Sequence, residues 1–185
     1  MEHRIVVIGY GNLLRCDDGV GQYIATQMMQ RNKVSIKAVV DAIALHQLTP
    51  ELVETLATVD LAIFVDAYLA HSELDEVRVE SVAIAPAGLA TGHWCEPSVL
   101  LAMTQALHHY APNAYWVTVP GVNFEFGEHL SLVAHRGITA AIHQIERLIE
   151  SFIQSALEPT LQSTLQSTLQ PTIQPTRTQP CMKSG

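Results

Sequence analysis

The sequence is short of charge, and of positive charge in particular. Charged residues make up 15% of its 185 positions, and 10 lysines and arginines stand against 18 aspartates and glutamates, for a net charge of −8. A surface that binds nucleic acid needs basic side chains gathered against the phosphates, so we expect no nucleic-acid partner. Hydrophobic residues make up 48% of the chain, which is enough for one sizeable core, and the length fits about one domain.

Cysteine is also scarce, and so are long apolar runs. The three cysteines, Cys16, Cys95 and Cys181, are odd in number and form no CxxC pair. This argues against a disulfide scaffold or a thiolate zinc site and favours a reducing compartment. No run approaches the roughly 18 apolar residues of a membrane span, and the first residues lead into a strand-like run without the apolar stretch of a signal peptide. We therefore expect a cytoplasmic protein with no membrane partner.

A low-complexity segment occupies the C-terminal part of the sequence. It repeats a four-residue unit, TLQS-TLQS-TLQP-TIQP, and residues 156–185 hold four of the nine prolines. We expect residues 1–155 to form one α/β domain and residues 156–185 to be a disordered, solvated tail rich in Thr, Gln and Pro. The alternative is a short helix that docks on the body through Leu161, Leu165 and Leu169, which recur at helical spacing.

The first 155 residues alternate short apolar runs with helical patterns. Runs rich in β-branched residues predict strands at 4–8, 34–40, 61–65, 77–84 and 115–119. Apolar spacing and capping signals predict helices at 20–29, from 49 onward, at 97–110 and at 131–153. This order predicts a three-layer α/β sandwich, in which a mostly parallel five-stranded sheet has helices on both faces. One strand-to-strand step without a helix indicates that one of the five strands is antiparallel.

The densest motif, GYGNLLRCDDGVG at 9–21, lies between the first strand and the first helix. Its glycines invite comparison with a dinucleotide-binding loop, but that fingerprint needs a third glycine where this chain has Leu14. The adjacent carboxylates Asp17 and Asp18 would also repel a pyrophosphate. A structural role for one of them is a cap on the first helix, which would leave the other free.

Two further aspartates follow predicted strands. Asp41 comes at the end of the second strand and Asp66 directly after the third. Ligands of open parallel sheets bind beyond the carboxyl ends of the strands, so we expect Asp18, Asp41 and Asp66 to share that edge. The alternative is that each strand-ending aspartate only satisfies amides of its own loop.

The loop at 91–96 adds an imidazole, that of His93. Two carboxylates and one imidazole suit a divalent ion such as Ni²⁺ or Zn²⁺, although a single histidine, taken alone, is more often a surface or capping residue. Cys16 and Cys95 lie close to these segments in the sequence and could supply a thiolate. The chain has no GxSxG pattern that would indicate a serine nucleophile.

The motif at 9–21 resembles the N-terminal signature of the [NiFe]-hydrogenase maturation endopeptidases. Three more segments match that family in order and spacing: VDA at 65–67, GHWCEP at 92–97 and VNFEFGEHLS at 122–131. The resemblance covers roughly residues 4–150. The segment HQLTPEL at 46–52 is similar to the subgroup that serves the bidirectional, NAD(P)-linked hydrogenase.

The resemblance implies one endoproteolytic cut, which removes a C-terminal peptide from the hydrogenase large-subunit precursor after nickel insertion. The metal-contacting residues of the family map onto Asp18, Asp66 and His93, with the nickel supplied by the substrate and no organic cofactor. Asp18, Asp66 and Asp41 are the catalytic candidates. One departure is the sequence Asp41-Ala42-Ile43-Ala44, where many relatives have a glycine-rich turn.

Two other classes of function remain open from the residues. One is a nickel-binding escort protein that uses the same ligands without hydrolysis. The other is a metal-dependent hydrolase of small molecules on a similar sandwich. For a protease, the residues also leave open whether a carboxylate or a bound metal ion activates the water.

Overall fold

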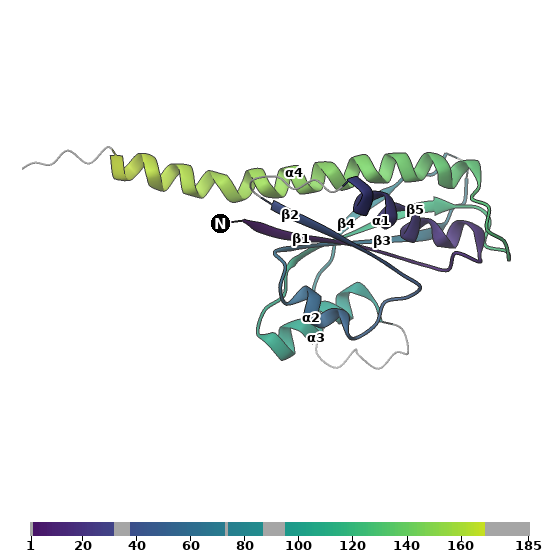
Figure 1. The fold of residues 1–185 in the computed structure, drawn as a ribbon, viewed down its shortest axis with the longest axis horizontal. Coiled ribbons are helices and arrows are strands. Elements are labelled where there is room, and N and C mark those ends of the chain that lie inside the picture. The colour runs from purple at the N-terminus through teal and green to yellow at the C-terminus, as the bar shows by residue number, and fades with distance from the viewer. Residues whose placement is uncertain (1, 32–37, 73, 87–94, 169–185) are drawn as a thin grey trace, which may run out of the picture. The chain divides into compact units, whose positions relative to one another are not determined.

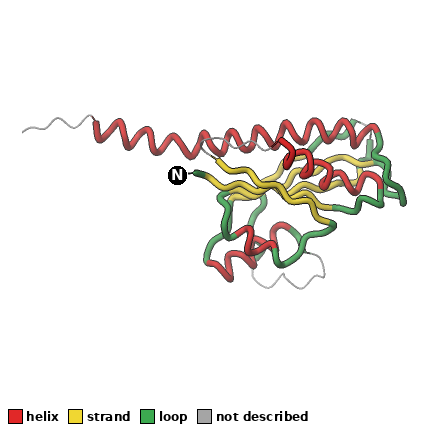
Figure 2. The backbone as a smooth tube through the Cα atoms, viewed as in Figure 1, coloured by secondary structure: helices red, strands yellow, loops and turns green. Residues whose placement is uncertain are grey.

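The computed structural model describes residues 2–31, 38–72, 74–86 and 95–168, with side chains described through residue 156. These residues contain a five-stranded sheet in the order β2-β1-β3-β5-β4. The strands are β1 (His3–Tyr10), β2 (Ala38–Leu45), β3 (Leu61–Leu69), β4 (Arg78–Ser81) and β5 (Asn113–Gly121). The helices are η1 (Cys16–Gly19), α1 (Val20–Arg31), α2 (Leu52–Leu56), α3 (Pro97–His108) and α4 (Leu132–Thr168). Figure 2 shows the strands as one layer between helices.

Alternation along the strands divides the core into two layers. In β1, Ile5 and Val7 pack with residues of α1 and α4, whereas Val6 and Ile8 pack with residues of α2 and α3. Successive side chains of a strand point to opposite faces, so a continuous apolar run requires cover on both. Figure 1 shows this cover, with α1 and α4 on one side of the sheet and α2 and α3 on the other.

The predicted α/β architecture is confirmed. The pairs β1–β2, β1–β3 and β3–β5 are parallel, and β4 pairs antiparallel with β5 at the edge. Since β3 leads to β4 without an intervening helix, this is the antiparallel step that the sequence predicts.

The second strand departs from the prediction. Among the described residues it runs from Ala38 to Leu45, five residues past the predicted end at 40, and the predicted start at 34–37 lies outside the described residues. Asp41 therefore lies within β2, paired with Val6, and the prediction that it ends the strand is wrong. The residues after it explain the difference, because the apolar sequence Ala42-Ile43-Ala44-Leu45 continues the strand where a glycine-rich turn would end it.

The long C-terminal helix also departs from the prediction. We expected it to end near residue 153, but α4 is continuous through Thr168. Leucines at 157, 161 and 165 keep a four-residue spacing that suits a helix, which outweighs the weak helix propensity of the threonines. By internal contacts the chain divides into residues 1–153 and 154–185. Of the predicted tail, 169–185 lies outside the described residues, and a tail that does not contribute to the core stays a prediction.

None of the helices that the structure describes combines the length and apolarity needed to cross a membrane.

Helix α1 approaches the sheet closely at Gly21. A Cβ atom on this residue would collide with the backbone carbonyl oxygens of Tyr10 and Val65. Backbone atoms of two paired strands cannot move aside as a flexible side chain can. Glycine at this position therefore sets the start of α1 directly against the ends of the β1–β3 pairing.

We predict that Gly21→Ala destabilises the protein by about 2 kcal/mol or more, because the added methyl group overpacks a backbone contact. In an exposed helix the same change would stabilise by up to about 1 kcal/mol. Urea unfolding followed by circular dichroism measures the difference. Thr26→Ala is the matched control, since Thr26 is exposed on the same helix. A Gly21→Ala variant as stable as the wild type would contradict the contact.

Candidate active site

The candidate site is centred on Asp66, at the level where β1 ends. The last β1–β3 pair joins Gly9 to Val65, and β3 continues beside β5 as far as Leu69. Asp66 therefore lies within β3, not after it, because pairing with β5 outlasts pairing with β1. Tyr10, the last residue of β1, follows Val6 and Ile8 on the α2–α3 face, and Asp66 follows Phe64 on the same face.

Tyr10 and Asp66 interact directly. The Tyr10 hydroxyl donates a hydrogen bond to the Asp66 carboxylate, and the Ala67 N–H donates to Asp66 Oδ1 at 2.8 Å. Burial raises the pKa of Asp66 to about 6, against these two hydrogen bonds, which lower it, and with the charge of Asp18, which raises it further. The pKa of Tyr10 is also raised, mainly by burial and next by the negative charge of Asp66. The Asp66 carboxyl group therefore has a pKa close to neutral pH.

Trp116 of β5 lies on the same face of the sheet as Asp66 and Tyr10. It pairs with Phe64 of β3, and Phe64 lies on that face. The indole Nε1 is buried and has no hydrogen-bond partner among the described residues, although it lies near enough to the Tyr10 hydroxyl to lower the pKa of that group. A buried N–H donor of this kind is normally paired, so within the described part of the chain it is a candidate donor to an oxygen of a bound ligand.

The adjacent aspartates of the first motif have different surroundings. Asp17 is fully buried, and its carboxylate accepts hydrogen bonds from the backbone N–H groups of Val122, Asn123 and Ser131 at 2.8, 3.0 and 2.7 Å. Asp18 is half-buried, and its Oδ2 accepts the Asn12 N–H at 2.8 Å. Asp17 thus holds the loop after β5, while Asp18 is the one whose charge acts on Asp66.

Among the described residues, neither aspartate side chain accepts a hydrogen bond from an N–H group of α1. The capping role considered for one of them is therefore not seen, and both carboxylates bind loop N–H groups instead. Glycine makes the close approach of Asp18 possible. Gly11 has φ +132°, and a Cβ there would collide with the Asp18 carbonyl oxygen.

The structure does not bring Asp41 to this cluster. Asp41 pairs with Val6, four residues before Tyr10 along β1, which is roughly 13 Å of strand. It is exposed on β2, at the edge of the sheet. His93 lies outside the described residues, so its predicted position beside Asp18 and Asp66 stays a prediction. Within the described residues no three His, Cys, Asp or Glu side chains form a cluster that could hold a metal ion.

The two cysteines near the motifs are poor candidates for thiolate chemistry. Cys16 is buried with 5% of its surface exposed, and its N–H donates to the Gly127 carbonyl at 2.9 Å. The pKa of the Cys95 thiol is raised, mainly by burial and next by the negative charge of Glu51. A thiol with a raised pKa is a weaker nucleophile and metal ligand at neutral pH.

Tyr10 and Trp116 are not among the site residues that the sequence predicts. Both could have been found from strand alternation, because each occupies the same face as Asp66 on a neighbouring strand. The middle residue of the Gly9-Tyr10-Gly11 motif was treated only as part of a loop, whereas it is the last residue of β1.

We predict that Asp17→Asn destabilises the protein by at least about 3 kcal/mol, because an amide NH₂ replaces one of two oxygens that accept buried backbone N–H groups. Asp18→Asn is the matched control at the neighbouring position, where one N–H is accepted and the side chain is half-buried. Thermal unfolding of both variants measures the difference. Equal melting temperatures for the two variants would contradict the anchoring role of Asp17.

We predict that Asp66→Asn becomes more stable relative to the wild type as pH rises. The ordinary pKa of 3.8 rises to about 6 on folding. Between these values the folded chain holds a proton that the unfolded chain has released, so the contribution of Asp66 to stability is greatest below pH 4 and falls until about pH 6. The variant lacks this loss and gains roughly 2 to 3 kcal/mol over the wild type.

Urea unfolding at pH 4 and pH 8 tests this prediction. Asp41→Asn removes an exposed carboxylate of the same sheet and controls for the loss of one negative charge. If the difference between Asp66→Asn and the wild type is the same at both pH values, the folded-state shift of Asp66 is absent.

Comparison with known proteins places the fold. No model of a protein family matches the chain, and no curated protein matches it. Solved structures do. The hydrogenase maturating endopeptidase HybD from E. coli matches with a TM-score of 0.61 and 21% identity, over 80% of this chain and 93% of that one. The hydrogenase 2 maturation peptidase from a Thaumarchaeota archaeon matches with a TM-score of 0.58 and 19% identity, over 80% and 98%.

The [NiFe] hydrogenase maturation protease HybD from Thermococcus kodakarensis also matches, with a TM-score of 0.57 and 16% identity, over 78% of this chain and 98% of that one. The predicted resemblance to this family is thus confirmed in the fold. The similarity to the bidirectional-hydrogenase subgroup stays a prediction. The chain has the fold of the [NiFe]-hydrogenase maturation proteases.

Proposed function

We propose that this protein is an endopeptidase that removes the C-terminal peptide from a [NiFe]-hydrogenase large-subunit precursor after nickel has been inserted. One observation carries the proposal: on a fold shared with maturation proteases, Asp66 is held beside Tyr10 with a pKa near 6 and under the influence of Asp18. Both aspartates belong to the motifs that resemble the family. Perturbed carboxylates at the carboxyl ends of parallel strands are typical of a functional site.

Burial of Asp66 favours the binding of a cation to its carboxylate. A carboxylate that is partly desolvated is stabilised when a positive ion takes the place of the proton it would otherwise hold. In the proposed function that ion is the nickel of the precursor, and Asp18, Asp66 and His93 are its ligands. Binding of a substrate-held ion fixes the scissile bond relative to the site, so that recognition also provides positioning.

Asp41 has no role in this proposal, because it is about 13 Å along the sheet from the level of Tyr10. The general base is then one of the two remaining carboxylates, unless nickel lowers the pKa of the attacking water. The Tyr10 hydroxyl keeps the Asp66 carboxylate oriented, and the Trp116 N–H, which has no well-aligned partner among the described residues, is suited to an oxygen of the bound peptide.

We predict that the wild type shortens a purified nickel-loaded precursor and leaves the nickel-free precursor intact, even when free nickel is added to the protease. Asp66→Asn and His93→Ala should each slow cleavage at least about 100-fold, because each removes a group that acts directly on the reacting centre. The measurement is the mobility shift of the large subunit on a denaturing gel. Asp41→Asn is the matched control and should cleave at the wild-type rate.

Each alternative has its own outcome. Equal cleavage of the nickel-free precursor would reject nickel recognition. Wild-type rates from both Asp66→Asn and His93→Ala would reject the residue assignment. Nickel uptake from the precursor without any shortening would indicate an escort protein. A precursor left untouched, together with hydrolysis of small amides, would indicate a metal-dependent hydrolase of small molecules.

A further inference from the structure

Two loops at the carboxyl ends of the strands are joined into one unit. They are residues 11–15, after β1, and residues 122–131, after β5, and are called the loop pair below. Backbone hydrogen bonds connect them in both directions, from the Gly127 N–H to the Leu14 carbonyl and from the Cys16 N–H to the Gly127 carbonyl, both at 2.9 Å. Arg15 and Gly127 form an isolated parallel bridge.

Side chains reinforce this connection. The Arg15 guanidinium donates to the Phe124 carbonyl oxygen through Nε at 3.1 Å and through Nη2 at 3.0 Å. Beneath them, the buried Asp17 carboxylate holds three N–H groups of the loop after β5. The backbone of the loop pair is therefore fixed by long-range contacts, not left to local flexibility.

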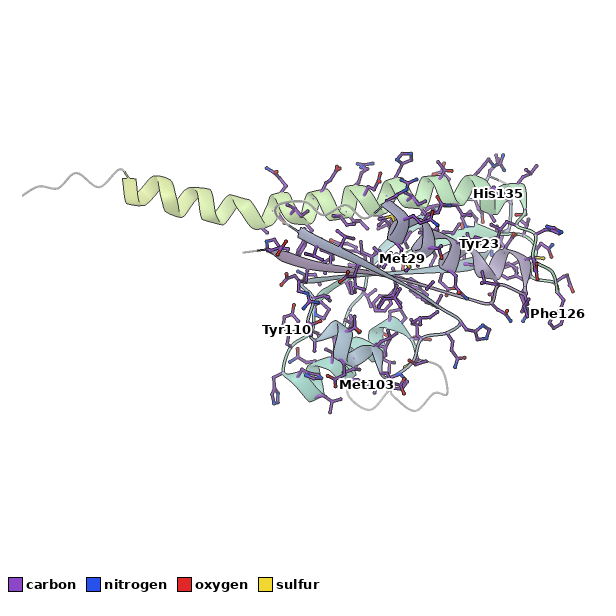
Figure 3. The ribbon with its side chains drawn as sticks, in the orientation of Figure 1. Tyr23, Met29, Met103, Tyr110, Phe126 and His135 are labelled. Atoms are coloured by element: carbon purple, nitrogen blue, oxygen red, sulfur yellow. The ribbon has the colours of Figure 1, made fainter. Side chains whose placement is uncertain are left out.

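Large apolar side chains project from this fixed backbone. Phe126 is 88% exposed, Leu14 58% and Leu13 40%, and Val122 at the start of the second loop is 44% exposed. Figure 3 shows Phe126 on the loop beyond the end of β5, pointing away from the sheet. A free loop could turn such side chains inward, but here the hydrogen bonds prevent that rearrangement. Exposed apolar side chains held on a rigid backbone are typical of a surface that binds another protein.

The loop pair is continuous with the candidate active site. The Asn12 N–H, within the first loop, donates to Asp18 Oδ2 at 2.8 Å. A folded protein whose terminal peptide reaches Asp18 comes next to this loop, so its body can contact Leu13, Leu14 and Phe126. A peptide alone, or a small molecule, would not need that surface.

We infer that the loop pair is the docking surface for the folded body of the large-subunit precursor, with Phe126 as its aromatic anchor. This inference rests on the proposed function and adds the contact by which the protease selects a folded protein. Aromatic side chains that become buried at the centre of an interface carry much of its binding energy, so Phe126 is expected to dominate. Since the backbone is already fixed, docking needs little ordering of the loops.

Steady-state cleavage of the nickel-loaded precursor tests the inference. Phe126→Ser should raise KM at least about tenfold and leave kcat unchanged, because it weakens docking and not the chemistry. Leu14→Ser should raise KM in the same direction. Leu107→Ser is the matched control, since Leu107 is 66% exposed on α3, whose end leads to the start of β5, at the opposite end of the strands from the loop pair. Its KM should equal that of the wild type.

The outcomes separate this inference from the proposed function. If the wild type cleaves and Phe126→Ser has an unchanged KM, the docking surface is wrong and the function stands. A lowered kcat with unchanged KM would also overturn docking. Sedimentation of the free protein adds a further check: a wild-type dimer that Phe126→Ser converts to a monomer, with unchanged KM, would make the surface an interface between copies. If the wild type does not cleave, the inference falls with the function.

Discussion

The rest of the site depends on the hydrogen bonds that the buried carboxylate of Asp17 accepts. Its two oxygens accept three backbone N–H groups, two directly after β5 and one at Ser131, next to the start of α4. A buried carboxylate is costly unless its oxygens are satisfied, and buried N–H groups are costly in the same way. Each therefore requires the other, and this requirement fixes the loop after β5 against the loop after β1.

Close approach of the helices to the sheet at two glycines provides the second constraint. Gly21 of α1 lies against the backbone carbonyl oxygens of Tyr10 and Val65, and Gly137 of α4 lies against the side chain of Val119 of β5. These contacts leave no room for even a methyl group, so the helices on this face sit close to the sheet. The consequence for the site is that Tyr10, Val65 next to Asp66, and the backbone of Asp18 are each in contact with a glycine, and backbone positions vary less than those of side chains.

The sequence predicts much of the fold because its signals are physically direct. Apolar runs such as 61–65 must be covered on both faces, and the missing helix between β3 and β4 predicts the antiparallel edge. The errors occur where local signals compete. Asp41 looks like a strand end, but the apolar residues after it continue β2. The helical spacing of leucines at 157, 161 and 165 outweighs the threonines, so α4 continues beyond residue 153.

The site is less predictable because its chemistry depends on long-range contacts. Adjacent aspartates at 17 and 18 are indistinguishable by residue type, and only the buried N–H groups more than 100 residues away separate their roles. Tyr10 and Trp116 gain their importance from register between strands, which a single sequence does not specify. The placement of Asp18 and Asp66 near each other, by contrast, follows from parallel topology alone.

The sequence separation of these contacts has a consequence for how the protein is made. The bonds of Asp17 join residues that are 105 to 114 positions apart in the chain. During synthesis, the loop that carries Asp18 therefore emerges early and stays without its partners until Ser131 has been added. Such non-local contacts require β5 and the loop after it to be in place. A nascent or truncated chain that lacks β5 and the following loop has no N–H groups to satisfy Asp17, so the candidate active site is complete only when the whole domain is present.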